Sequence, residues 1–351
     1  RGIQNLYTIV ETTVNSLKEL GAEPFIVSAM GSHGGGTEEG QREVLAGYGI
    51  TEERLGVPVV TTVDTVYLGN CANGRPVWFD RAAYEADLIV PINRVKLHTD
   101  FVGPIQSGLC KMLVIGLGNH KGCSAVHEEA PEVFADAIEE TARLILQKAP
   151  VGFGIAILEN AYDKTYAVEA VPAEHLVERE KELVQIAKGN MPYIMLDEAD
   201  VIVCGAIGKD ISGAGFDPNI LGRSSVLKQF VLHIPRYQRL VLCDVTPASH
   251  GNGIGVGLFD VITKKVAEQL DLESMYANAI ACNCLGDASV PCTVDDEETA
   301  IRVALKCCRN IDRDHPRIIR IQNTLHLGEI EVSEALLDAV RADSRMSLIE
   351  N

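Results

Sequence analysis

Apolar residues recur every three to four positions along several long segments, which is the pattern of amphipathic helices. It is clearest at residues 5–20, 131–149 and 173–190. Shorter runs rich in valine and isoleucine, typical of buried strands, lie at 23–30, 56–63, 87–92 and 151–160. Alternation of the two patterns predicts an α/β fold with mainly parallel sheets.

The second half of the chain continues this alternation after a polar break. Strand patterns are present at 199–208, 239–246 and 317–324, and helical ones at 297–308 and 333–342. The break at 188–192 ends one helix before the next strand begins. A chain of 351 residues exceeds what one core usually organises.

We therefore expect two α/β domains, with the active site in a cleft between them. The first is expected to be a cofactor-binding domain at 1–190, and the second to cover 191–325. The segment 326–351 is expected to pack back on the first domain. Because the chain starts at Arg1 and a helix follows almost at once, we also expect the true N-terminus to precede this sequence.

Charge and cysteine usage restrict the partners. The formal net charge of -18 disfavours nucleic acid and anionic membranes, so a carboxylate substrate would need local cations. The ten cysteines form no CxxC pair, which favours reduced thiols in a cytoplasmic protein over a zinc or iron–sulfur site. No apolar run is long enough for a transmembrane helix. A small molecule is the expected partner, and a homodimer is possible.

The first candidate site is the glycine-rich segment 29–41, AMGSHGGGTEEGQ, between a strand and a helix. Thr37 is the expected N-cap of that helix. The backbone around Ser32, His33, Gly34 and Gly35 could bind an anion, although such turns are often only tight connections. Neither a dinucleotide fingerprint nor a Walker loop is present.

The second candidate is 93–127, which follows the strand 87–92 on the side where open α/β sheets usually bind ligands. It concentrates basic and imidazole side chains in an acidic protein: Arg94, Lys96, His98, Lys111, His120, Lys121 and His127. Lys111 stands within an apolar run, although burying an unpaired ammonium costs several kcal/mol. The histidine spacings match no zinc signature.

A third candidate is the loop 208–223, GKDISGAGFDPNILGR. Lys209 and Arg223 could hold a carboxylate in a cleft. The alternative is a structural loop with ordinary ion pairs.

Taken in order, GSHGG, VYLGNCANGRPV, HTDF, SGLCK, GLGNHKG, a later VH and ADVIVCGAIGKDISG resemble the lactate racemase superfamily of nickel-pincer-nucleotide isomerases. In that family a lysine is joined through a thioamide to a pyridinium mononucleotide that binds nickel. A histidine sixteen residues further on completes the coordination. The resemblance assigns the tether to Lys111 and the nickel ligand to His127. An acylated lysine carries no charge to bury.

The resemblance also implies the other roles. His98 resembles the proton-transferring histidine, and His33 carries over from the family's glycine-rich loop, where Gly34 replaces an arginine. Where the family has a second catalytic histidine this chain has Thr61, Thr62 or Asp64, so Asp64 is a candidate for the opposite proton. The implied site residues are: catalytic His98, His33 and Asp64; cofactor-binding Lys111, Ser32, His33, Gly34, Gly35, Ser107 and Gly108; metal-binding His127; substrate-binding Arg1, Lys209 and Arg223.

The implied function is racemisation or epimerisation of a 2-hydroxy acid or sugar acid by hydride transfer to the lysine-tethered nickel-pincer nucleotide. Two alternatives stay open. One is a divalent-metal-dependent hydrolase that uses His33, His98, His120 or His127. The other is a non-catalytic protein that binds a nucleotide or cofactor.

Overall fold

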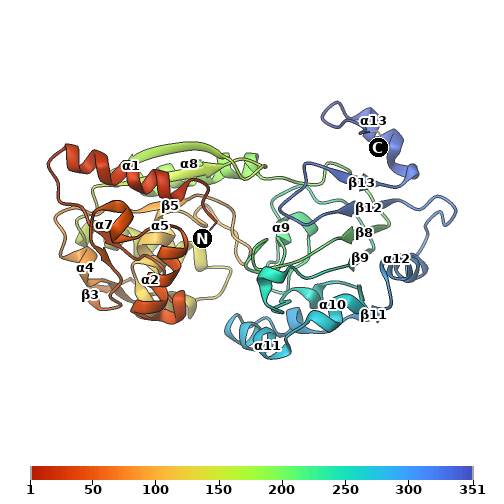
Figure 1. Cartoon of the computed structure of the whole chain (residues 1–351), viewed down its shortest axis with the longest axis horizontal. Coiled ribbons are helices and arrows are strands. Elements are labelled where there is room, and N and C mark those ends of the chain that lie inside the picture. The colour runs from red at the N-terminus through yellow and green to blue at the C-terminus, as the bar shows by residue number, and fades with distance from the viewer. Residues whose placement is uncertain (1, 350–351) are drawn as a thin grey trace. The chain divides into compact units, whose positions relative to one another are not determined.

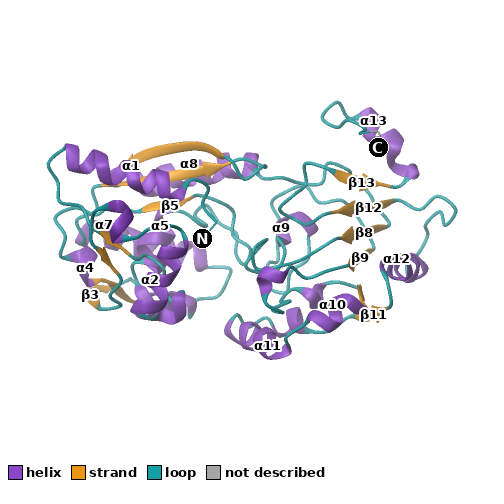
Figure 2. Ribbon diagram, viewed as in Figure 1, coloured by secondary structure: helices purple, strands orange, loops and turns teal. Residues whose placement is uncertain are grey.

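The computed structural model describes residues 2–349, which form two compact units, one ending at Met191 and the other starting at Pro192. Helices and strands alternate in both units (Figure 1), and Figure 2 shows the same elements by type. The α/β class predicted from the hydrophobic pattern is confirmed. The expected cleft between the domains stays a prediction.

The first unit contains most of the elements expected from the hydrophobic pattern. Its helices are α1 (Leu6–Glu19), α2 (Glu38–Gly47), α3 (Glu52–Leu55), α4 (Arg81–Tyr84), α5 (Leu109–Lys111), α6 (Asn119–His127), α7 (Phe134–Lys148) and α8 (Leu176–Asn190). Its strands are β1 (Ile26–Val27), β2 (Val59–Val60), β3 (Thr65–Asn70), β4 (Pro76–Asp80), β5 (Ile92–Arg94), β6 (Phe153–Glu159) and β7 (Thr165–Pro172). A π-helix at Met112–Gly116 follows α5 directly and precedes α6.

The sheets of the first unit are mixed rather than mainly parallel, which corrects the expectation for this half. β1 pairs β2 and β5 pairs β6 in parallel, but β3–β4 and β6–β7 are antiparallel. The reason lies in the short connections at 71–75 and 160–164. A turn of a few residues can join only antiparallel strands, because a parallel pair needs a long crossover.

The amphipathic pattern of α1 buries one face. Val10 and Val14, one turn apart, pack against Ile50, Leu55 and Val57. This cluster fixes the first helix to the segment between β1 and β2 through apolar burial, worth about 25 cal/mol per Å².

The second unit is built on one twisted sheet. Its strands are β8 (Val201–Cys204), β9 (Arg239–Leu242), β10 (Val261–Thr263), β11 (Cys292–Val294), β12 (Ile318–Ile321) and β13 (Ile330–Val332). Their order is β11-β10-β9-β8-β12-β13, parallel except for the edge strand β13. Its helices are α9 (Pro218–Leu221), α10 (Lys264–Gln269), α11 (Leu272–Ala281), α12 (Glu297–Lys306) and α13 (Leu337–Ala342).

All four residues of β8 are buried, as a central parallel strand requires. Ala300 and Ala304 of α12 pack on the valines of β8, β9 and β10, and Figure 1 shows α12 beside this stack of strands.

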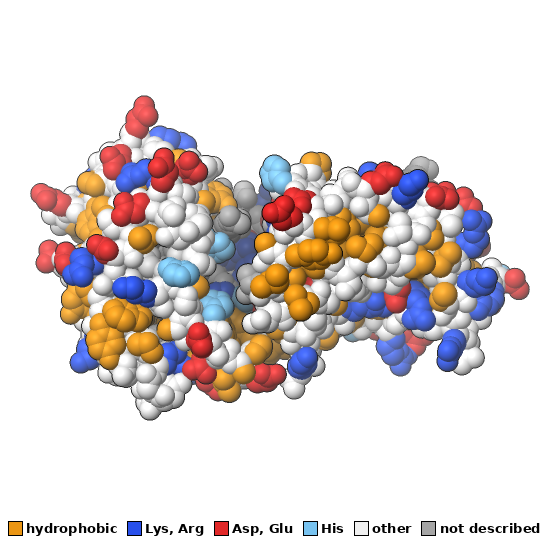
Figure 3. Space-filling model, turned by 90° about the horizontal axis from the view of Figure 1, so that it is seen from below, with side chains coloured by type: hydrophobic (Ala, Val, Ile, Leu, Met, Phe, Trp, Pro, Cys, Tyr) orange, Lys and Arg blue, Asp and Glu red, His pale blue; other side chains and the backbone are white. Residues whose placement is uncertain are grey.

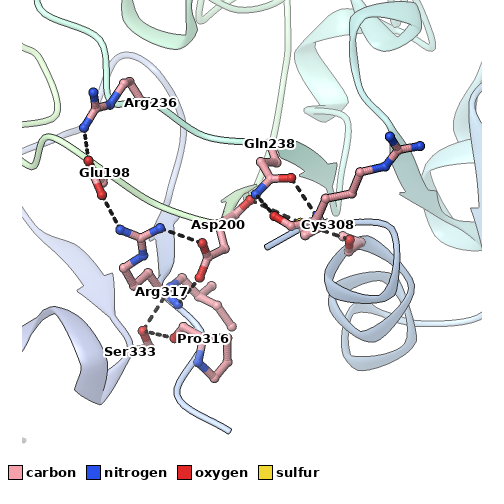
Figure 4. Close-up of polar contacts among 11 residues, drawn as sticks. Glu198, Asp200, Arg236, Gln238, Cys308, Pro316, Arg317 and Ser333 are labelled. Atoms are coloured by element: carbon pink, nitrogen blue, oxygen red, sulfur yellow. Dashed lines mark hydrogen bonds and ion pairs between the residues drawn. The ribbon is translucent and has the colours of Figure 1, made fainter. Parts of the chain in front are cut away.

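A buried carboxylate ties β8 to β12. Asp200 lies directly before β8, and its two oxygens accept hydrogen bonds from the backbone N–H and the guanidinium of Arg317, at 2.7 and 2.9 Å (Figure 4). Ser333 donates to the carbonyl of Pro316 at 2.7 Å and accepts from the N–H of Ile318 at 2.9 Å.

The C-terminal segment 326–351 contributes a strand to the second unit, and its packing on the first domain stays a prediction. Its strand β13 extends the sheet of the second unit through antiparallel pairing with β12, from Ile319↔Val332 to Ile321↔Ile330. An edge strand of a parallel sheet offers unpaired N–H and C=O groups, and β13 satisfies them there.

Two sequence-based expectations concern the chain as a whole. Among residues 2–349, no helix combines the length and the apolar character needed to cross a bilayer. The cysteines of the same residues are thiols rather than disulfides, as their usage predicted.

Candidate active site

A closed loop brings His98 close to Lys111. After β5, Lys96 and Ser107 exchange backbone hydrogen bonds of 2.9 and 3.2 Å, which closes the loop between them. The buried side chain of Gln106 braces this loop, since its Oε1 accepts from the N–H of His98 at 2.7 Å and its Nε2 donates to Gly103 O at 3.1 Å. The loop therefore brings His98, near its start, close to Lys111 in the helix that follows the loop.

The two side chains are in direct contact. Lys111 Nζ lies 2.5 Å from His98 Nε2, and the backbone N–H of Asp100 donates to His98 Nδ1 at 3.1 Å. Burial lowers the pKa of Lys111 to about 8. Burial and the positive charges of Lys111 and Lys96 hold the pKa of His98 well below its usual value. Each pKa thus moves in the direction that favours the neutral form, although an amine with a pKa of about 8 is still mostly charged at pH 7.

His127 joins this pair through a row of aromatic rings. The ring of His98 stacks on Phe101 with centroids 4.3 Å apart, Phe101 lies 4.8 Å from Phe134, and Phe134 lies 5.1 Å from His127. The His127 Nδ1 is 2.7 Å from the carbonyl of Cys123, one turn earlier on α6. An Nδ1–H bonded to a carbonyl leaves the Nε2 lone pair for another partner, which is how metal-binding histidines are commonly oriented.

The thiol of Cys123 completes this corner. Its Sγ lies 3.5 Å from His127 Nδ1 and 3.8 Å from Ser32 Oγ. The hydrogen bond to Cys123 raises the pKa of His127. The glycine-rich loop after β1 thus reaches the same cluster through Ser32.

That loop packs closely on the π-helix. The N–H of Gly31 donates to Gly116 O at 3.0 Å, and a Cβ at Gly34 would lie 2.5 Å from the backbone of Gly40. Gly34 and Gly35 both have positive φ, so glycine is required by conformation there as well. Thr37 caps α2 as predicted, since its hydroxyl accepts from Gly40 N at 3.1 Å.

A polar joint fixes α6 after the π-helix. Asn119 has a φ of 51° and donates to the buried carboxylate of Asp80 at 2.8 Å. The N–H of Asp80 donates to Leu117 O at 2.6 Å. Lys111 and His127 are therefore not on one continuous helix. The contacts of Asn119 and Asp80 fix the start of α6, the helix that carries His127.

Relatives were found for this chain at the level of a family model and of solved structures. Residues 3–136 match the model of the lactate racemase N-terminal domain. A structure of the lactate racemase apoprotein from Thermoanaerobacterium thermosaccharolyticum has a TM-score of 0.50 at 14% identity, with 84% of this chain and 82% of that chain covered. Residues 3–136 are thus similar to the lactate racemase N-terminal domain, and the chain shares its fold with a lactate racemase.

A second solved structure is less similar to this chain. A Thermotoga maritima protein from a structural genomics target has a TM-score of 0.39 at 12% identity, with 67% of this chain and 69% of that chain covered. No curated protein matches this chain.

The predicted site residues of the first unit fall into two groups. The structure brings together His98, Lys111 and His127, with Ser32 at the Cys123 side, and places Ser107 and Gly108 directly before the lysine helix. His33 is exposed directly before the 3-10 turn Gly34–Gly36, Asp64 is exposed on the approach to β3, and the roles of both stay predictions. Figure 3 shows histidine side chains gathered on one face of the first unit.

The cations predicted to bind the substrate do not belong to the described cluster of the first unit. Lys209 and Arg223 belong to the second unit, and Arg1 lies outside the described residues. The guanidinium of Arg223 pairs with Asp260 at 2.6 Å, and the ammonium of Lys209 donates to Gly213 O at 2.6 Å and to Asn278. The charge of Arg223 is thus already balanced, and both assignments stay predictions.

Sequence reasoning missed Glu180, which lies in α8 under the lysine helix. The side chain is fully buried, and its Oε2 accepts from the N–H of Cys110 at 2.8 Å. A Cβ at Gly108 would lie 2.6 Å from its carboxyl group. Burial raises the pKa of Glu180 to about 7. The sequence did contain a signal of this, because Glu180 lies at helical spacing on the face of α8 that carries Leu176, Val177, Leu183, Val184 and Ala187.

Glu180 makes stability depend on pH in a stated direction. Because the folded pKa exceeds the unfolded one, the folded state holds the extra proton, so stability is greatest below about pH 4.5 and falls as pH rises to about 7. We compare the free energy of unfolding of Glu180→Gln with that of the unmodified chain at each pH. Between pH 5 and pH 8 this difference should shift in favour of the variant by about 2–3 kcal/mol, because only the unmodified chain loses stability as Glu180 ionises. Denaturant titrations at both pH values measure this. The exposed Glu174→Gln is the control, and an equal pH dependence in both variants would contradict the assignment.

Proposed function

We propose that this lactate racemase-like protein racemises or epimerises a 2-hydroxy acid or sugar acid with a nickel-pincer nucleotide held on Lys111. The observation that carries the proposal is the contact of a half-buried lysine with His98, beside a histidine whose Nδ1 is already committed to a backbone carbonyl. The sixteen-residue spacing from the resemblance supports the same pair, Lys111 and His127.

The residues of the cluster fit such a group. Lys111 would hold it covalently, and the Nε2 of His127 would be a nitrogen ligand of the kind that suits nickel. The close approach of Gly31 to Gly116 and the positive φ of Gly34 and Gly35 leave this wall free of side chains. Among residues 2–349, no three His, Cys, Asp or Glu side chains converge as a metal site, so one histidine plus a tethered ligand accounts for the donors better than a hydrolase centre does.

When bound, the nickel-pincer nucleotide supplies an acceptor for the hydride on the carbon that bears the hydroxyl. The chain supplies the proton transfer. His98 lies within hydrogen-bond distance of the tether nitrogen and is biased toward the neutral form, so it can take the hydroxyl proton of a substrate placed there and return it.

Other side chains would exclude water and attract the carboxylate. Phe101 and Phe134 form an apolar wall between His98 and His127. Lys96 is exposed and close enough to depress the pKa of His98, so it offers a positive charge on the side of the base. His33 or Asp64 is proposed for the opposite proton.

Peptide mass spectrometry with nickel analysis tests the proposal on protein produced together with cofactor-synthesis enzymes. We expect a nucleotide-sized adduct on Lys111, one nickel per adduct, and interconversion of the isomers of a hydroxy acid. Lys111→Ala should lose all three. An unmodified Lys111 under those conditions would remove the proposal, and an adduct without isomerisation of any hydroxy or sugar acid would favour the non-catalytic alternative.

A further inference from the structure

The arginines of the second unit differ in whether a carboxylate balances their charge. Arg317, for example, pairs with the buried Asp200 (Figure 4). Among residues 192–349, every other arginine also forms an ion pair, except those at 302, 309 and 313. Carboxylates are abundant in a chain with a net charge of -18. Three neighbouring arginines without an ion pair therefore leave positive charge available to a ligand at this place.

Two of these arginines line a cavity of about 420 Å³ between α12 and the segment that follows it. The apolar part of its lining consists of partly buried residues, namely Ile301, Leu305, Ile311 and Pro316. The first three pack against the core cluster that covers β8, β9 and β10. The volume is within the range of about 300–1,000 Å³ that is typical of small-molecule pockets.

The sequence of α12 produces this arrangement. Residues four positions apart lie on the same side of a helix, so neighbouring pairs of this kind form parallel rows. Three rows follow: small residues that pack on the sheet, apolar residues in the cavity, and cations that also line it. Their members are Ala300 and Ala304, Ile301 and Leu305, and Arg302 and Lys306.

A third cation of the lining is held by the end of the helix. Arg313 donates from Nη1 to Leu305 O at 2.9 Å and from Nη2 to Cys308 O at 3.1 Å. A guanidinium has more N–H donors than these two carbonyls use, so donors remain for a ligand. The carbonyl end of a helix carries partial negative charge, which favours cations there without the ion pair that a carboxylate would form.

We propose that this cavity binds an amphiphilic carboxylate, with the apolar chain of the ligand against Ile301 and Leu305 and its carboxylate on the cations. Arginine binds carboxylates through charge-assisted hydrogen bonds, and burial of the chain adds the hydrophobic part of the affinity. Three cations and one carboxylate, Glu298, line the cavity, so its charge complements an anion.

The ligand is a carboxylate free in solution rather than a lipid in a bilayer. The net charge of -18 repels an anionic membrane surface, whereas a small anion responds mainly to the cations next to it. The cavity belongs to the second unit and the candidate active site to the first, so this inference goes beyond the proposed function.

The test uses the whole cofactor-free chain and octanoate as the probe, with the methyl groups of isoleucine and leucine observed by NMR. We expect the methyl signals of Ile301, Leu305 and Ile311 to shift together during the titration and to give one dissociation constant. Unchanged signals of all three, at every octanoate concentration below the onset of micelles, would overturn the proposal.

Three related compounds separate the contributions of chain and charge. 1-Octanol keeps a chain of the same length without the charge, octyltrimethylammonium reverses the charge, and acetate keeps only the carboxylate. We expect each to bind about tenfold more weakly than octanoate, or weaker still, because each loses one of the two interactions. An affinity of 1-octanol equal to that of octanoate would contradict a role for the cations.

A double variant removes two cations from the lining. Arg302→Gln with Lys306→Gln changes only exposed side chains, so the fold should be kept. We expect the affinity for octanoate to fall about tenfold and that for 1-octanol to stay the same. Arg341→Gln is the control, since this exposed arginine of α13 pairs with Asp338 at 3.3 Å and should not matter. Equal octanoate affinity in the double variant and the unmodified chain would show that the cations do not bind the carboxylate.

Vesicles of phosphatidylglycerol distinguish the free carboxylate from a lipid in a bilayer. We expect the chain not to sediment with them. Sedimentation with vesicles that is lost in the double variant would show that the cations bind a membrane surface, and the proposal would then be wrong. Because no cofactor is present in any of these measurements, their outcomes are independent of the proposed racemisation.

Discussion

Replacing His98 with glutamine is expected to lower the rate constant for isomerisation, per cofactor-bearing chain, by about 10²–10⁴. Glutamine can keep a hydrogen bond near Lys111 Nζ and to Asp100 N, but it cannot take a proton in the pH range of the reaction. The loss should fall on kcat more than on KM, because proton transfer belongs to the transition state rather than to substrate binding.

The measurement is the rate of interconversion of the two isomers, normalised by the adduct found on Lys111. His175→Gln, an exposed histidine directly before α8, is the matched control and should keep the rate. In the unmodified protein, activity should extend below pH 6.5, since the lowered pKa of His98 keeps the base neutral there. A loss below threefold in His98→Gln at equal adduct would show that another group moves the proton.

Replacing Gly108 with alanine is expected to destabilise the fold by about 2–4 kcal/mol. The backbone there is extended, so the new methyl group causes no strain by itself. Its carbon would lie 2.6 Å from the Glu180 carboxyl, which would have to leave the N–H of Cys110 inside a closed environment.

Denaturant unfolding and a double-mutant cycle check this result. Gly108→Ala should cost much less in a Glu180→Ala background, since the atoms in conflict are then absent. Gly189→Ala in α8, where no atom lies within 4 Å of the added carbon, is the control and should be neutral or slightly stabilising. Equal costs of Gly108→Ala in both backgrounds would place the conflict elsewhere.

The sequence predicted those helices and strands whose own residues show which of their faces are buried. The helical periodicity at 5–20 predicted α1, because a helix buried on one face has apolar residues every three to four positions. The continuous apolar run at 199–208 predicted β8, because a strand buried on both faces has no polar positions. The hairpin β3–β4 was missed. Its turn chemistry, ending at Gly74 with a φ of 87°, was present in the sequence but was interpreted only as part of a motif.

The site was predictable only in part, for a related reason. Lys111, His98 and His127 were found because unusual residue types stand in apolar or glycine-rich surroundings. Their distances depend on the bridge between Lys96 and Ser107 and on the aromatic row, which join residues that no local pattern connects. The donor at Asp100 is a backbone group, and every residue but proline carries one, so its role is visible only in three dimensions.

The π-helix at Met112–Gly116 has a consequence for how relatives of this chain are compared. A π turn holds one residue more than an α turn of the same height, so the count from Lys111 to His127 includes a residue that adds no advance along the axis. Removing one residue here can therefore convert the π turn into an α turn and leave the following segment in place, with Leu117 O still accepting from the N–H of Asp80. An alignment gap of a single position inside 112–116 therefore marks a change between π and α geometry and does not by itself move the histidine.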